Sequence, residues 1–198
     1  MTAYRQVRAN YDRASIVVYQ AYNDAIADSA IDAQKFVAPF SFNRMTWIKS
    51  SFLWLMERSG WATKANQTRI LAIRISRSGW ERALSQGVLT SFEPSVHRSV
   101  DAWRLQFEAS PVHVQWDPER SIHGRKLEHR AIQVGISRQL IEEYVSSWIQ
   151  SIEDMTQFAN KVRRMRMAGK HSEARRLLPI EREYSVQSET RRQLGISK

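Results

Sequence analysis

The spacing of apolar residues most strongly limits what this chain can fold into, because it alternates between a strand-like and a helix-like period. Four short segments either alternate apolar and polar residues or are rich in β-branched and aromatic residues, as β-strands are. These segments cover residues 16–22, 67–76, 112–116 and 130–136. The sequence therefore predicts at least these strands. An all-α bundle is the alternative, because short apolar runs also occur in buried helices.

Segments with helical spacing separate the predicted strands. Asn23 is a suitable N-cap, Gly60 and Gly87 are suitable C-terminal stops, and Ser137 precedes the longest helical pattern. Residues 117–129 are predicted to form a polar loop. The predicted helices cover residues 24–36, 44–59, 78–86, 99–109, 138–162 and 163–178.

These elements predict a single α+β domain over residues 1–184. Its small central sheet is expected to be mixed or antiparallel, with about four or more strands flanked by helices. A long basic helix is expected near the C-terminus, and residues 185–198 are expected to be a flexible tail.

Positive charge is concentrated near the C-terminus. The chain has a formal net charge of +10, of which residues 161–198 contribute +7. Such a field attracts polyanions, and nucleic acid first among them. We therefore predict that Arg163, Arg164, Arg166 and Lys170 bind nucleic acid. The alternative is a solvated helix face whose charges only keep the protein in solution.

Several kinds of site and location are excluded by what the sequence lacks. It has no cysteine, which excludes disulfides and thiolate sites, and its histidines are too scattered for a metal site. Neither a glycine-rich phosphate loop nor a Gly-x-Ser-x-Gly elbow occurs. No segment has the ~18–20 apolar residues of a membrane span, and the N-terminus lacks the apolar core of a signal peptide. We therefore expect a cytoplasmic protein with no membrane partner and no metal.

Polar and aromatic side chains gather at the predicted strand ends, which is where α/β proteins place ligand-binding groups. Gln115 and Asp117 flank Trp116 at the end of one strand, and Gln133 lies in the next. Asp117 and Gln133 are predicted to be catalytic.

Basic residues also alternate with tryptophans in the segment that contains Arg44, Lys49 and Arg58. That mixture suits contacts with phosphate and with a base or nicotinamide ring. The alternative is that the tryptophans belong to the core and the basic side chains extend from it to solvent.

Long stretches of the chain match a known family pattern. They are VYQAY at residues 18–22, PFSFNRMTWIKSSFLWLMERSGWATK at 39–64, VQWDPER at 114–120 and HRAIQVGIS at 129–137. Together they resemble the bacterial and fungal family called domain of unknown function 4291, over about residues 5–178. One departure is Ser50, where the family pattern leads us to expect proline. The resemblance implies no particular activity.

The order of elements is also similar, at the level of the fold, to that of ADP-ribosyltransferases, which hold NAD in a cleft between two small sheets. This resemblance implies a catalytic role for Gln20 at the nicotinamide ribose, with Gln133 at the late polar position. The first strand lacks the Arg or His expected in those enzymes. The predicted cofactor-binding residues are Arg8, Tyr22, Arg44, Trp47, Lys49 and Gln115, and the implied cofactor is NAD.

The sequence leaves three functions open. The first is an enzyme that acts on nucleic acid, RNA above all, or on a nucleotide, with transfer of ADP-ribose from NAD as one form. The second is a non-catalytic nucleic-acid-binding module that uses the basic C-terminal helix. The third is a structural or regulatory protein whose basic helix docks on an acidic partner.

Overall fold

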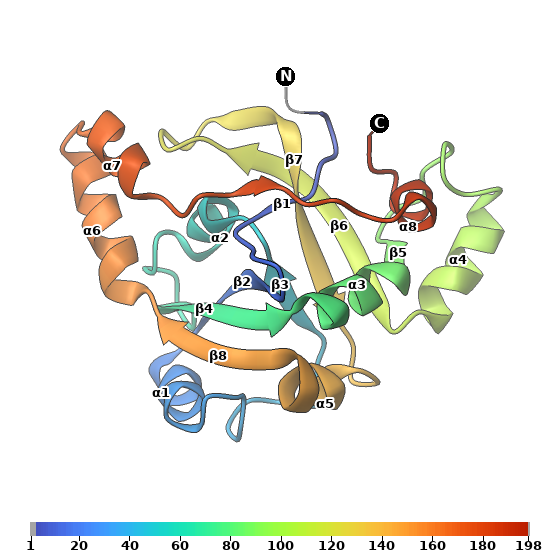
Figure 1. The fold of residues 1–198 in the computed structure, drawn as a ribbon, viewed down its shortest axis with the longest axis horizontal. Helices are drawn as coiled ribbons and strands as arrows, with labels where there is room; N and C mark the ends of the chain where they lie inside the picture. The colour runs from blue at the N-terminus through green and yellow to red at the C-terminus, as the bar shows by residue number, and fades with distance from the viewer. Residues whose placement is uncertain (1–2, 198) are drawn as a thin grey trace.

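The computed structural model describes residues 3–197 and shows a mixed β-sheet covered by helices (Figure 1). Within these residues the large sheet has seven strands in the order β5-β6-β7-β3-β2-β4-β8, and β1 pairs with β9 separately. The β5–β6 pair is parallel and the other pairs are antiparallel. The α+β prediction is confirmed, the sheet is larger than expected, and an all-α bundle is excluded.

The strands are β1 (Arg8–Ala9), β2 (Ser15–Tyr22), β3 (Thr46–Lys49), β4 (Arg69–Ser76), β5 (Gly87–Leu89), β6 (Val112–Arg120), β7 (Lys126–Ile136), β8 (Ile149–Asp154) and β9 (Arg182–Glu183). The helices are α1 (Asp24–Ala33), α2 (Phe52–Ser59), α3 (Arg77–Ser85), α4 (Val100–Ala109), α5 (Ile141–Glu143), a π-helical turn (Tyr144–Trp148), α6 (Thr156–Met167), α7 (His171–Leu177) and α8 (Ser188–Gln193).

The ladder of paired residues is shortest between β2 and β3. These two strands pair only at Tyr19 and Lys49, whereas β2 pairs with β4 along its whole length and β3 pairs with β7 along its own. The sheet therefore consists of two half-sheets, β5-β6-β7-β3 and β2-β4-β8. We call the line between β2 and β3 the seam.

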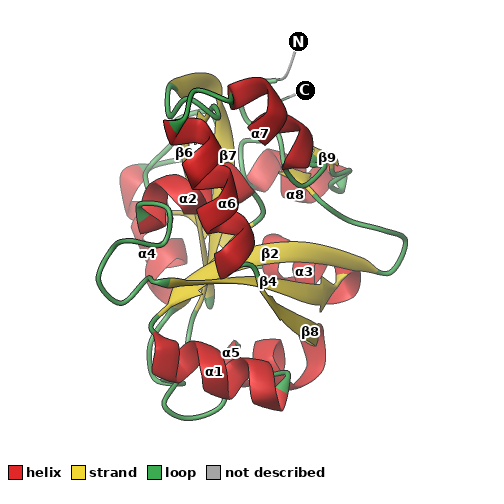
Figure 2. Cartoon of the chain, turned by 90° about the vertical axis from the view of Figure 1, so that its left-hand side faces the viewer, coloured by secondary structure: helices red, strands yellow, loops and turns green. Residues whose placement is uncertain are grey.

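Each face of the sheet has its own apolar core. Alternation along β2 directs Ile16 and Val18 to one core, and Val17 and Tyr19 to the other. The first core includes residues of α1, α3 and the π-helical turn, and the second includes residues of α2, α6 and α7. Figure 2 shows α1 and α5 on one side of β2, β4 and β8, with α6 on the other.

The helices α1 to α4 each start at a side-chain N-cap, whereas Ser137, the predicted start of a helix, does not cap α5, whose N-cap is Leu140. The side chain of Asn23 accepts a hydrogen bond from the Ile26 amide at 3.0 Å and starts α1. Ser99 accepts one from the Ala102 amide at 3.2 Å and starts α4. The predicted helices at 24–36, 78–86 and 99–109 are confirmed with shifted ends.

The predicted helix over residues 44–59 is wrong in its first half. Residues 46–49 form β3, which pairs with β7, and a helix begins only at Phe52. Ser51 caps that helix by accepting a hydrogen bond from the Trp54 amide at 3.1 Å. Pairing between strands distant in sequence has overridden the helical spacing of the apolar residues.

The single long helix predicted after Ser137 is also wrong. The chain forms α5, the π-helical turn, β8 and then α6. Strand β8 pairs with β4, and its Ile152 is 4% exposed. Residues 149–154 therefore form a strand because they pair with the edge of β4, although their apolar spacing alone predicts a helix.

The predicted loop over residues 117–129 is largely strand. β6 and β7 continue as a hairpin in which Asp117 faces Ala131 and Pro118 faces Arg130. The pairing is irregular after Pro118, as expected where proline cannot donate to the ladder. The extension places Asp117 in β6, where its side chain accepts a hydrogen bond from Gln133 of β7.

The C-terminal region differs from the prediction in two ways. The long basic helix is divided into α6 and α7 by a turn at Gly169, whose φ is +74°. The part of the chain next to β1 is β9, which precedes the segment expected to be a flexible tail, and that segment contains α8 (Figure 1). Leu194 is fully buried, and the Trp116 indole donates to its carbonyl at 2.9 Å.

None of the helices within residues 3–197 is both long and apolar enough to cross a membrane.

If the C-terminal segment packs as described, Leu194→Ala should lower the free energy of unfolding by about 2–5 kcal/mol, the range for truncating a buried leucine. Urea denaturation measures the change. The control is Leu105→Ala on α4, whose leucine is 70% exposed and should change stability little. Equal effects of the two substitutions would contradict the packing of this segment.

Candidate functional site

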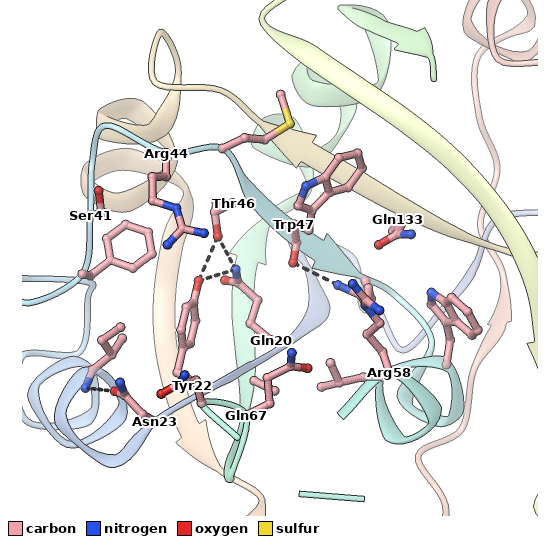
Figure 3. Close-up of a pocket in the computed structure, with 18 of the residues that line it drawn as sticks. Gln20, Tyr22, Asn23, Ser41, Arg44, Thr46, Trp47, Arg58, Gln67 and Gln133 are labelled. Atoms are coloured by element: carbon pink, nitrogen blue, oxygen red, sulfur yellow. Dashed lines mark hydrogen bonds between the residues drawn. The ribbon is translucent and has the colours of Figure 1, made fainter. Parts of the chain in front are cut away.

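A cleft of about 880 Å³ opens where β2 and β3 separate (Figure 3). Its walls come from both half-sheets, from α2 and from the loops before β3 and β4. The lining residues are Gln20, Ala21, Tyr22, Asn23, Ile26, Pro39, Phe40, Ser41, Arg44, Met45, Thr46, Trp47, Lys49, Trp54, Leu55, Arg58, Asn66, Gln67, Gln115, Asp117 and Gln133.

The cleft brings together most of the site residues predicted from the sequence. Eight of them line it: Gln20, Tyr22, Arg44, Trp47, Lys49, Gln115, Asp117 and Gln133. Arg8 lies elsewhere, in β1. Its guanidinium donates to the Glu181 carbonyl at 2.7 Å, and its charge favours the carboxylates of Glu119 and Glu181.

Gln20 bridges the seam through its side chain. Its Oε1 accepts from the Tyr144 hydroxyl at 2.8 Å. Its Nε2 donates to the Tyr22 hydroxyl at 2.8 Å and to Thr46 Oγ1 at 2.6 Å (Figure 3). Both amide hydrogens are thus used. Because Gln20 is also 3% exposed, its contacts suit a positioning role better than direct chemistry.

This network leaves one hydrogen for a ligand. The hydroxyls of Tyr22 and Thr46 lie 2.8 Å apart and both accept from Gln20, so one of them must donate to the other. The accepting hydroxyl keeps its own hydrogen free. Burial raises the pKa of both Tyr22 and Tyr144, so these phenols stay protonated near neutral pH. The Gln20 network can therefore present one O–H donor to the cleft.

A row of polar side chains crosses the other half-sheet. Lys49 pairs with Gln133, and Gln133 pairs with Gln115, so their side chains project from the same face. Asp117 accepts from Gln115 Nε2 at 2.8 Å and from Gln133 Nε2 at 2.5 Å. Both carboxylate oxygens are engaged, which fixes the orientation of both amides.

Lys49 is the most deeply buried cation of the cleft, at 6% exposure. Its Nζ donates to the Trp47 carbonyl at 3.4 Å, a long hydrogen bond. Burial, and then the nearby charge of Arg58, lower its pKa to about 8, although Asp117 acts in the opposite direction.

Aromatic groups lie among these polar ones. Gly135, opposite Trp47 in β7, leaves room for the indole, since a Cβ there would come within 3.0 Å of its ring. The Trp54 Nε1 is buried and has no hydrogen-bond partner among the described residues. The Trp54 side chain also lines the cleft, so two tryptophans contribute to its walls.

Sequence reasoning missed several cleft residues, namely Thr46, Trp54, Asn66 and Gln67. Thr46 was missed because its segment was interpreted as a helix. In a strand, Thr46 and Lys49 project from opposite faces, and that alternation was not recognised. Asn66 and Gln67 precede β4 in a turn, where Asn66 has φ +61°. Asparagine adopts a positive φ more readily than most residues, so Asn66 was the residue that could have indicated this turn in the sequence.

The predicted nucleic-acid-binding residues lie apart from the cleft lining, on α6 and the turn after it. The Arg166 guanidinium lies 5.5 Å from the centroid of the Trp61 ring and donates to the His123 carbonyl at 3.3 Å. Arg164 and Lys170 are exposed and Arg163 is half-buried. None of these four forms an ion pair with another residue of 3–197.

A smaller hollow of about 310 Å³ lies beside these residues, with His123, His171, Arg175 and Arg176 among its walls. The rings of His123 and His171 are 4.1 Å apart. Within residues 3–197, no three or more His, Asp or Glu side chains are grouped so that they could hold a metal ion.

If Gln20 joins the half-sheets as described, Gln20→Leu should lower the free energy of unfolding by about 3 kcal/mol, since each buried polar group left unpaired costs about 1–3 kcal/mol. Thermal or urea denaturation measures the loss. Gln67→Leu is the matched control, because Gln67 lines the same cleft without a side-chain hydrogen bond to the described residues. A loss no larger than the control's would contradict the structural role of Gln20.

Residues 6–184 match the sequence model of a family described as "Domain of unknown function (DUF4291)". Among curated proteins, none matches the chain. The matched range contains all residues that line the cleft.

Proposed function

This chain belongs to the DUF4291 family, as its long matching segments indicate, and we propose that it is a group-transfer enzyme that binds a nucleotide in the seam cleft. The observation that carries the proposal is a surplus of hydrogen-bond donors. Arg44, Lys49 and Arg58 line the cleft, and among its described lining residues the one carboxylate is Asp117, whose oxygens already accept from two amides. Such a site favours an anionic ligand rich in acceptors.

The shape and composition of the cleft favour a nucleotide among anionic ligands. A volume of about 880 Å³ suits a ligand of that size. Trp47 and Tyr22 offer aromatic faces for a base or nicotinamide ring, and the two arginines suit phosphate oxygens. The free hydroxyl hydrogen of the Gln20 network suits an acceptor of the ribose or of the ring.

NAD is the dinucleotide that we propose as cofactor. The cleft lies between two half-sheets with Gln20 on an early strand and Gln133 on a late one, which is the layout expected of ADP-ribosyltransferases. The support is fold-level analogy. In such a transfer positive charge develops at the ribose carbon as nicotinamide leaves. Asp117, held by Gln115 and Gln133, would stabilise that charge, and Gln20 would position the hydroxyls.

The proposal predicts that a nucleotide raises the melting temperature in a saturable way, because a ligand that binds only the folded state stabilises it. We expect NAD or a related nucleotide to do so. Arg58→Gln should weaken binding about tenfold or more, since one charge-assisted phosphate contact contributes about 1.5–3 kcal/mol. Differential scanning fluorimetry across a nucleotide series measures the effect.

The matched control for Arg58→Gln is Arg138→Gln, which removes the same charge from an exposed position outside the cleft. It should leave the nucleotide shift unchanged. No shift with any nucleotide, or equal losses in both variants, would overturn the proposal.

Nucleic-acid binding is the second candidate function, either alone or as delivery of the substrate. It is favoured by the cationic cluster of α6 and α7, whose Arg163, Arg164 and Arg166 have no carboxylate partner within 3–197. A phosphate backbone supplies the missing negative charge. RNA is the nucleic acid that we favour.

For this candidate, the logarithm of RNA affinity should fall linearly with that of salt concentration, with a slope of about −0.7 per phosphate contact on a single strand. Replacing Arg163, Arg164 and Arg166 by Gln should make the slope shallower by about 2. The control replaces Arg98, Arg104 and Arg138, which are exposed elsewhere. A slope that changes equally in both triple variants would contradict binding through α6.

A further inference from the structure

Lys49 stands apart from the other lysines. The chain has 23 arginines and 7 lysines, so arginine is its usual cation. The other described lysines, at positions 35, 64, 126, 161 and 170, are all exposed, whereas Lys49 is 6% exposed inside the cleft. Arginine would hold phosphate better, because its planar group binds two oxygens and keeps its charge. What lysine adds is an amine that can lose its proton.

The surroundings of Lys49 favour loss of that proton. No carboxylate within 3–197 forms an ion pair with it, and both oxygens of Asp117 are engaged by amides. Its one hydrogen bond to a described residue is the long contact with the Trp47 carbonyl. Arg58 adds a like charge. A buried lysine beside another cation is a usual setting for an amine nucleophile.

We propose that Lys49 is a nucleophilic amine that forms an imine with the carbonyl carbon of a phosphate-bearing aldehyde or ketone bound in the cleft. The proposal rests on the anion-binding role of the cleft proposed above and adds a carbonyl group to the chemistry of a bound ligand. A sugar phosphate with a free carbonyl group is the chemistry that fits.

The step balances without an oxidant or reductant. The Nζ lone pair forms a bond to the carbonyl carbon, and the carbonyl π electrons move to the oxygen. The nitrogen then loses a proton and the oxygen gains one, which gives a carbinolamine. Loss of the hydroxyl group with one more proton releases water and leaves the imine. Both protons exchange with water in the cleft.

Neighbouring donors suit the oxygen atoms of such a substrate. Arg58 carries a fixed positive charge and lines the same part of the cleft as Lys49. Its guanidinium can hold a phosphate or stabilise the oxygen of the carbinolamine, while Lys49 attacks the carbon. Trp54, which is 8% exposed, adds an aromatic side chain to the cleft lining.

Pyridoxal 5′-phosphate is a suitable probe, because it combines a phosphate with an aromatic aldehyde. The full chain is incubated with it, reduced with borohydride and mapped by mass spectrometry, since reduction converts the imine into a stable secondary amine. We expect Lys49 to be modified about ten times faster than any exposed lysine, since a lower pKa gives a larger amine fraction near pH 7. The rate should rise with pH and level off above about pH 8.

Two variants complete the experiment. Lys49→Arg should abolish the adduct at this position while the exposed lysines react as before. Arg58→Gln should slow modification of Lys49, whereas Arg138→Gln should not. The sites modified in the wild-type protein test the proposal by themselves, so the result does not depend on whether a variant folds. Modification of Lys49 no faster than that of Lys35 or Lys64 would overturn the proposal.

Nucleotide competition separates this proposal from the proposed function. If NAD or AMP protects Lys49, both are supported. Rapid modification of Lys49 with no nucleotide binding supports the amine and contradicts the nucleotide site. Nucleotide binding without selective modification of Lys49 contradicts the amine and leaves the nucleotide site standing.

Discussion

The single pair between Tyr19 and Lys49 is the constraint on which the rest of the structure depends. The two half-sheets meet there and then diverge, which leaves backbone and side chains of β2 and β3 facing a space instead of each other. A sheet that opens in this way must be held by other bonds. The Gln20 amide supplies them, because it joins Tyr144 on one side to Thr46 on the other. The cleft and the bond network that spans it are therefore two consequences of one break in strand pairing.

The same break explains the electrostatics of the cleft. Strand β3 turns Lys49 and Trp47 toward one face and Thr46 toward the other, so the opening is reached by polar groups from both faces of the sheet. Because the local dielectric constant is low, the free energy of each polar group depends strongly on whether it has a hydrogen-bond partner. Asp117 accepts from two amides, while no carboxylate within residues 3–197 forms an ion pair with Lys49. The imbalance is what a bound anion would correct.

The C-terminal segment supports the cleft from behind. Glu181 accepts a hydrogen bond from the Phe52 amide at 2.7 Å, at the first residue of α2, and so holds the helix that carries Trp54 and Arg58. Burial raises the pKa of Glu181 to about 8, partly offset by that hydrogen bond. Arg8 lies here and not in the cleft, because β1 pairs with β9 and brings its side chain to the Glu181 carbonyl. Arg8, which was predicted to bind cofactor, thus joins β1 to the C-terminal segment.

The sequence by itself determined the fold class, several helix starts and most of the cleft, because caps, alternation and the grouping of polar with aromatic residues are local properties. Asn23 caps its helix, and Gln115, Asp117 and Gln133 meet because adjacent strands of opposite direction bring them together. Only the tertiary structure decided that residues 46–49 and 149–154 are strands, since their hydrogen-bond partners lie far away in sequence. It alone also decided where the sheet opens, because the divergence of β2 and β3 is set by the packing of two cores and leaves no signal in either strand.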